Sequence, residues 1–70
     1  MTIDEFIENN KGIIKGYVCM DSNGKWWLCS KEPKTCVDHW YNPYDTGYLY
    51  PLHNIAPVEN WGSSLRKVGK

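Results

Sequence analysis

The chain has 70 residues, of which 41% are hydrophobic, 14% aromatic and 23% charged, with four Trp and five Tyr beside one Phe. A chain this short buries only about 60% of its unfolded surface, which leaves room for one small core and excludes a second domain. Eight Lys and Arg residues balance eight Asp and Glu residues, so the basic excess typical of duplex-DNA binding is missing.

Cysteine content and apolar run lengths bear on the compartment. Three cysteines, Cys19, Cys29 and Cys36, cannot form a closed set of disulfides, which favours a reducing, cytoplasmic environment. The apolar runs are far shorter than the roughly 20 residues of a membrane-spanning helix. We also expect no secretory leader before the first element. We therefore expect a single domain over residues 1–70, without a membrane partner.

The first expected element is a short helix over about residues 3–9. Thr2 followed by Glu5 forms a capping-box pattern, and Phe6 lies between two isoleucines at helical spacing. Two turns of helix are too short to persist alone. The apolar stripe is therefore expected to pack on the rest of the domain.

A β-hairpin is expected around the Asp-Ser-Asn-Gly turn. Either Asn23-Gly24 forms a two-residue loop, or a type I turn starts at Asp21 and ends with Gly24 in a left-handed bulge position. The second alternative sets Met20 opposite Trp26 and gathers the largest apolar side chains on one face of the hairpin. We expect this register. The other face then carries Tyr17, Cys19, Trp27 and Cys29.

The remaining chain reads as a meander, so that β structure covers about residues 13–68. The expected elements are a surface loop over 31–34, a third strand from 36 or 37 to 41 and a fourth strand over 48–50 that ends at Pro51. An irregular segment or a single turn of helix is expected over 52–60, and a last strand near 65–68. The predicted fold class is α+β. A short N-terminal helix packs on a bent antiparallel sheet of four to five strands, which could close into an SH3-like partial barrel.

A pattern of turn and aromatic residues runs from position 17 to position 61. It comprises the Tyr17–Leu28 hairpin, Glu32-Pro33, Trp40, Gly47, Leu49–Leu52, Pro57 and Trp61. The pattern resembles that of small uncharacterised β-rich proteins encoded by phages and mobile elements of gut bacteria. The chain departs from it where Tyr50 separates Leu49 from Pro51, and where Gly62-Ser63-Ser64 replaces an expected acidic run. The resemblance implies a small β-rich intracellular protein of mobile-element type, with no known activity.

The cysteine and histidine side chains are candidates for two kinds of site, a structural zinc site and a catalytic thiol. Cys19, Cys29, Cys36 and His39 are the ligand types of a structural zinc site. Only the Cys36 and His39 pair has zinc-like spacing, so we predict no metal and no cofactor. Thiol catalysis by Cys36 would need both Asp38 and His39, which on a strand point to opposite faces. We expect no enzymatic activity, because a single small core rarely also encloses a pocket.

Aromatic residues outnumber the places that so small a core offers. Adjacent strand residues point to opposite faces, so in Trp26-Trp27 and in Trp40-Tyr41 one ring can enter the core while its neighbour stays outside. Two interpretations stay open. The outer rings either anchor a protein interface or cover an undersized core. The residues predicted to contact a partner are Trp27, Trp40, Tyr41, Tyr44, Tyr48 and Trp61.

The predicted function is a non-enzymatic protein-binding module, of phage or mobile-element origin, that blocks a host defence or nucleic-acid enzyme by steric docking. Asp4, Glu5 and Glu8 could imitate phosphates, although acids at a helix start usually serve capping. Single-stranded nucleic-acid binding through ring stacking is an alternative, disfavoured by the zero net charge. A homodimer whose rings meet across a two-fold axis is another.

Overall fold

The computed structural model describes residues 1–37, 39–41 and 49–69. In chain order the elements are α1 (Ile3–Asn10), β1 (Gly16–Met20), β2 (Trp26–Cys29), β3 (Lys34–Cys36), β4 (His39–Tyr41), β5 (Leu49–Leu52), the 3-10 helix η1 (Trp61–Ser63) and β6 (Arg66–Val68). Every strand pairing is antiparallel. The predicted α+β class is confirmed, while closure into an SH3-like barrel stays a prediction.

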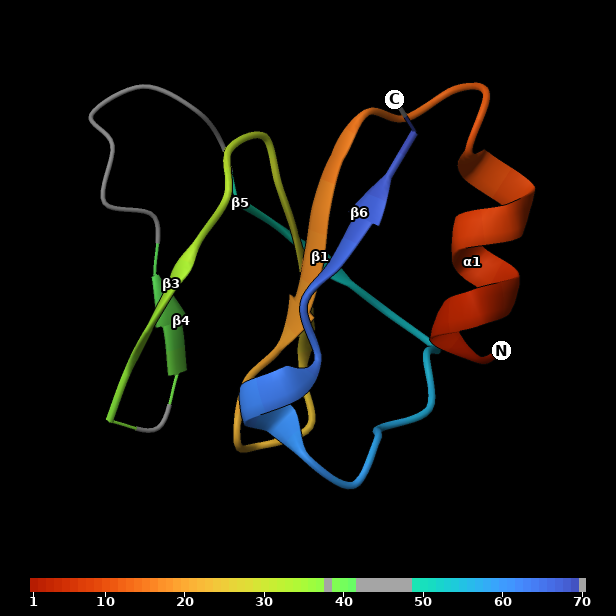
Figure 1. Cartoon of the computed structure of the whole chain (residues 1–70). Helices are drawn as coiled ribbons and strands as arrows, with labels where there is room; N and C mark the ends of the chain where they lie inside the picture. Colours follow the sequence, from red (N-terminus) through yellow and green to blue (C-terminus); the bar gives the residue numbers. More distant parts are fainter. Residues whose placement is uncertain (38, 42–48, 70) are drawn as a thin grey trace.

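The elements form three layers (Figure 1). A four-stranded sheet with the order β5-β2-β1-β6 lies in the middle, α1 lies on one side of it, and the separate β3–β4 hairpin lies on the other. The expected meander is therefore wrong. The segment expected to be a single third strand folds back at Val37, and β3 pairs with β4 instead of β2. Both edges of the β1–β2 hairpin are then left for β5 and β6.

The capping box of α1 forms as predicted, and the helix runs one residue further than the expected 3–9. The Glu5 backbone N–H donates to Thr2 Oγ1 over 3.2 Å, and the Thr2 N–H donates to Glu5 Oε1 over 3.1 Å. Ile3 is buried in the core, with Phe6 and Ile7 packed against it. The amphipathic stripe thus packs on the sheet, which supplies the stability that so short a helix lacks by itself.

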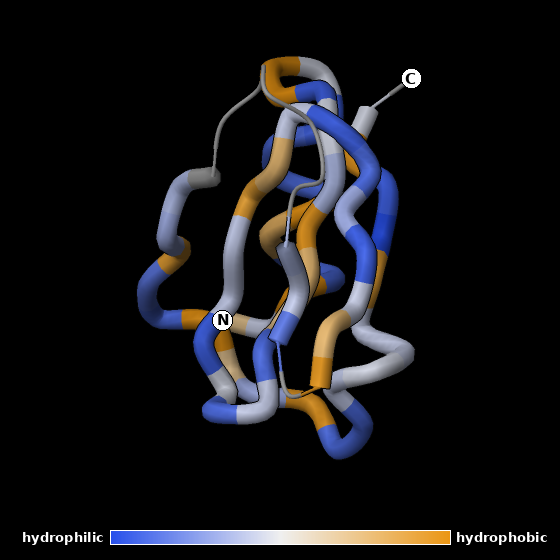
Figure 2. Tube along the Cα trace, turned by 90° about the vertical axis from the view of Figure 1, so that its left-hand side faces the viewer, coloured by the Kyte–Doolittle hydropathy of each residue, from blue (hydrophilic) through white to orange (hydrophobic). Residues whose placement is uncertain are grey.

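The β1–β2 hairpin has the predicted register, with Met20 opposite Trp26 and Val18 opposite Leu28. Gly24 has a φ of 85°, and its N–H donates to the Asp21 carbonyl over 2.9 Å, as the bulged type I turn requires. The helix-side core contains Ile3, Val18, Met20, Trp26, Leu28, Ile55 and Val68. Because one face of the strands packs on this core, hydrophobic and hydrophilic stretches alternate along the chain (Figure 2).

The outer strands differ in detail from expectation. β5 continues through Pro51 to Leu52 instead of ending at Pro51. It is an edge strand, where a residue without an N–H is tolerated. Residues 31–34 are not wholly a surface loop, because Pro33 is buried and Lys34 begins β3. β6 begins one residue later than expected, at Arg66.

A buried serine closes the pairing between β1 and β6. Ser64 is fully buried, and its Oγ accepts a hydrogen bond of 2.8 Å from the Met20 backbone N–H and lies 2.6 Å from the Trp61 carbonyl oxygen. Continued by two residues, the β1–β6 register would set Met20 opposite residue 64, so the hydroxyl takes the place of a backbone acceptor there. Across the described ranges, no helix has the length and apolar character to traverse a bilayer.

Candidate functional site

The β3–β4 hairpin is joined to the sheet by one carboxylate. Asp21 Oδ1 accepts a hydrogen bond of 2.8 Å from the Trp40 backbone N–H, and Oδ2 accepts one of 3.1 Å from Trp27 Nε1. With Cys19, these three residues line a small cavity of about 100 Å³. Asp21 therefore connects the turn of one hairpin to a strand of the other.

The Trp40 indole makes a second attachment. Its Nε1 donates to the Trp61 carbonyl oxygen over 3.2 Å, which ties β4 to η1. Trp27 is half-buried, and Lys25 Nζ lies over its ring, 4.9 Å from the ring centre, a cation–π distance. For these indoles the structure favours the interpretation in which rings cover a small core.

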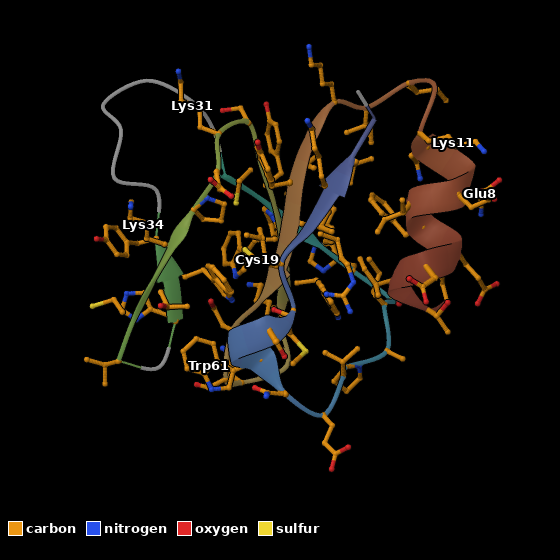
Figure 3. The ribbon with its side chains drawn as sticks, viewed as in Figure 1. Glu8, Lys11, Cys19, Lys31, Lys34 and Trp61 are labelled. Carbon is orange, nitrogen blue, oxygen red and sulfur yellow. The ribbon has the colours of Figure 1, made fainter. Side chains whose placement is uncertain are left out.

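The opposite side of the hairpin faces outward. Trp40 points toward the sheet, so its strand neighbours point away from it. We call this the outer hairpin face, made of Lys34, Cys36, His39 and Tyr41, which pair as Lys34 with Tyr41 and Cys36 with His39. All four are exposed, and Val37 at the tip is 93% exposed. Figure 3 shows Lys34 on this side and Cys19 in the middle of the fold.

The predicted contact residues fall into three groups. Trp27, Trp40 and Trp61 are half-buried, Tyr41 is 40% exposed, and Tyr44 and Tyr48 lie outside the described residues. Tyr50 is 57% exposed but is not among the predicted residues. The structure thus brings Trp27, Trp40 and Trp61 together around internal hydrogen bonds and leaves Tyr41 on the outer hairpin face. Their role in partner contact stays a prediction.

Of the acidic helix residues, Glu5 and Glu8 make local contacts. Glu5 belongs to the capping box, and Glu8 forms an ion pair of 2.9 Å with Lys11. The hydrogen bonds from the Thr2 backbone N–H and from its hydroxyl hold the pKa of Glu5 below its ordinary value. Figure 3 shows Glu8 and Lys11 on the outside of α1. These contacts support a capping role and leave phosphate imitation a prediction.

The four residues with the ligand types of a structural zinc site are divided by the fold into two pairs. Cys19 and Cys29 are buried with their Sγ atoms 3.9 Å apart, whereas Cys36 and His39 lie across the exposed hairpin. Within the described part of the chain, no three His, Cys, Asp or Glu residues gather as metal ligands. Cys36 and His39, the residues weighed for thiol catalysis, are both exposed, and Asp38 is not among the described residues.

Comparison with known proteins adds nothing to this geometry. The chain matches no protein-family profile, and neither a curated protein nor a solved structure is significantly similar to it.

The sequence does not predict the roles of two residues that hold the site together. From the sequence, Asp21 is expected only in a turn, and Ser64 has no expected role. Asp21 did carry a signal, because a carboxylate next to a tryptophan-rich strand is an acceptor for indole N–H groups. Ser64 carried no such signal, since its hydroxyl acts through Met20, 44 residues away.

Proposed function

We propose that the chain is a non-enzymatic protein-binding module that docks through the outer hairpin face. The observation that carries the proposal is the way in which the hairpin is held. Its inward residue Trp40 makes two hydrogen bonds to other elements, while Tyr41 and Val37 expose apolar surface. A hairpin that existed only to cover the core would not require this outward apolar side.

The attachment of the hairpin favours binding on energetic grounds. An isolated two-stranded hairpin is at best marginally stable in water. Here Asp21 and the Trp61 carbonyl fix it from two directions. A surface that is ordered before it binds avoids part of the entropy lost on association. Tyrosine is enriched among the residues that dominate binding energy, which makes Tyr41 the expected anchor.

Val37 adds a second reason to treat the tip as functional. It has a φ of 41°, in the left-handed region, which is strained for a β-branched residue. Its side chain is 93% exposed, so burial within the chain does not compensate for this strain. Strained backbone persists mainly at functional sites, and contact with a partner would bury the valine.

A protein partner fits better than single-stranded nucleic acid. Base stacking needs an open ring face, and one face of Trp27 is occupied by Lys25. The zero net charge also offers little attraction for a phosphate backbone. Given the resemblance to phage and mobile-element proteins, the partner we propose is a host protein, blocked by steric docking.

Affinity capture from a bacterial lysate tests the proposal with matched variants. Tyr41→Ser and Val37→Asn each remove apolar surface from the hairpin, and asparagine tolerates the backbone of Val37. Ile13→Ser is the control, because Ile13 is 83% exposed beyond the end of α1, away from the hairpin. We expect the hairpin variants to lose proteins that the wild type and the control retain.

The same captures distinguish the alternatives. Recovery of the same proteins by all four forms would contradict docking through the hairpin. Recovery of single-stranded nucleic acid, with binding that weakens steeply with salt, would support the ring-stacking alternative instead. Light scattering on the purified chain reports a homodimer, and loss of that dimer in Tyr41→Ser would assign the face to self-association.

A further inference from the structure

Cys19 and Cys29 form an unexplained pair on the hairpin side of the sheet. Cys19 lies opposite Trp27, and Cys29 lies opposite Tyr17, so the two cysteines are diagonal neighbours on one face. The right-handed twist of a sheet brings one such diagonal together. The two Sγ atoms are 3.9 Å apart, and both residues have 0% exposure.

The two sulfurs are in direct contact, on strands that pair along the whole β1–β2 ladder. A disulfide needs an S–S distance of about 2.05 Å and β-carbons about 3.5–4.5 Å apart. From a separation of 3.9 Å the Sγ atoms must therefore approach each other by about 2 Å, through side-chain rotation and a small adjustment of the strands. The backbone beneath them is fixed by the β1–β2 ladder. The two thiols are also hydrogen-bonded to each other, so the side chains already face one another.

We propose that Cys19 and Cys29 are a reversible redox site, which a small peroxide converts to an intramolecular disulfide. Two S–H bonds break and one S–S bond forms. The two electrons reduce the O–O bond of the peroxide, and with hydrogen peroxide as oxidant the two thiol protons leave in two molecules of water. A dithiol reductant reverses the change by thiol–disulfide exchange.

The surroundings select the class of oxidant. Cys19 lines the cavity of about 100 Å³ beneath Trp27 and Trp40, which has room for a molecule near the size of water. Oxidised glutathione is much larger and would have to displace the β3–β4 hairpin before it reached either sulfur. A reducing compartment keeps such a pair as thiols, and disulfides that do form there are usually transient or redox-sensing.

Proton sharing within the pair supports the reactivity. The hydrogen bond with Cys29, together with burial, raises the pKa of Cys19. The same hydrogen bond lowers the pKa of Cys29, although its burial acts in the opposite direction. Peroxides react with the thiolate form of cysteine. The pair therefore provides one thiol that keeps its proton and one that loses it more readily.

Cys36 provides an internal reference. It is exposed on the outer hairpin face, so it reports oxidation that needs no special environment. The inference goes beyond the proposed binding function and does not depend on it, because the disulfide can be detected in the isolated chain.

The experiment uses folded Cys36→Ser protein treated with hydrogen peroxide, quenched with catalase, and then unfolded in N-ethylmaleimide. We expect an intact mass lower by the two thiol hydrogens, with no maleimide attached. Dithiothreitol should restore two labelled cysteines. Wild-type protein whose Cys36 is blocked with N-ethylmaleimide before treatment should likewise lose two hydrogens and take up no second maleimide, which covers the case in which the substitution disturbs the fold.

Two results would overturn the proposal. The first is labelling of both Cys19 and Cys29 after a peroxide dose that fully oxidises Cys36 in wild-type protein whose Cys36 has not been blocked. The second is addition of oxygen atoms without loss of the two hydrogens, which indicates sulfinic acid instead of a disulfide. The double variant Cys19→Ser, Cys36→Ser is the control, because its single thiol at position 29 cannot form the intramolecular bond.

Discussion

Asp21, at the end of β1, accepts a hydrogen bond of 2.8 Å from the backbone N–H of Trp40 in β4. These residues are 19 positions apart in the chain. The second carboxylate oxygen of Asp21 is occupied by the Trp27 indole. One side chain thus sets the position of the β3–β4 hairpin over the sheet, and with it the direction of the outer hairpin face.

Asp21→Asn should destabilise the chain by about 1–3 kcal/mol, because one carboxylate oxygen is replaced by an amide that cannot accept from Trp40 or Trp27. Asparagine keeps the turn preference of aspartate, so the loss reports the attachment and not the turn. Urea unfolding followed by tryptophan fluorescence measures the change. Glu59→Gln is the control at an exposed carboxylate, and equal stability of the two variants would contradict the proposed attachment.

Ser64→Ala should cost about 1–3 kcal/mol, since it leaves the buried N–H of Met20 without its acceptor. The Met20 amide should also exchange with solvent faster than in the wild type. Urea unfolding and amide hydrogen exchange by NMR measure the two effects. Ser63→Ala is the matched control on an exposed neighbour. Unchanged exchange at Met20 in Ser64→Ala would show that the hydroxyl does not pair with β1.

Gly16→Ala should destabilise the fold by about 1–3 kcal/mol through overpacking. A Cβ at position 16 would clash with the Cys29 carbonyl oxygen, which belongs to the adjacent strand and cannot easily move. Gly12→Ala is the control, because nothing lies within 4 Å of a Cβ placed there. Thermal unfolding of the two variants should separate them clearly. A wild-type melting temperature in Gly16→Ala would contradict the close approach of these strands.

Acid should weaken the start of α1 through Glu5. Its pKa is lowered in the folded state by the hydrogen bonds from Thr2, so the charged form contributes stability above the unfolded pKa. That contribution is lost as pH falls below the ordinary value of 4.5 and through the folded pKa. An NMR titration of the Glu5 carboxyl measures the shift. Thr2→Ala should return the pKa toward its ordinary value, and an unshifted Glu5 in the wild type would contradict the capping box.

The sequence predicted the elements that depend on interactions between residues close together in the chain, namely the start of α1 and the β1–β2 hairpin. The Thr2 and Glu5 pair located the start of α1, and the hydrophobic pattern chose the hairpin register with Met20 opposite Trp26. A shift of one residue would have exchanged the two faces of the hairpin, so the buried side determines the answer. The class α+β followed from these two elements.

Strand order could not be obtained in this way. β3 and β4 are only three residues each. So short a pattern does not show whether the segment forms one strand beside β2 or folds back into a hairpin of its own. The turn at Val37 has a left-handed backbone that a valine gives no reason to expect. Placement of β5 and β6 depends on contacts far apart in sequence, such as Ser64 with Met20.

The candidate site was predicted in residue type but not in arrangement. Trp40 was predicted to contact a partner, but its ring turns inward, is half-buried and donates a hydrogen bond to the Trp61 carbonyl. The neighbouring Tyr41 is the ring that faces outward. Alternation along a strand predicted that one of the two would point away from the sheet, although only the fold decides which one.

Site-specific photocrosslinking in bacteria tests the proposed docking function most directly. A photoreactive phenylalanine analogue replaces Tyr41 on the outer hairpin face in one variant and Ile13 beyond α1 in another, both exposed positions. Docking through the outer hairpin face predicts a discrete crosslinked protein from position 41 that position 13 does not give. Absence of any product at position 41, or identical products at both positions, would contradict it.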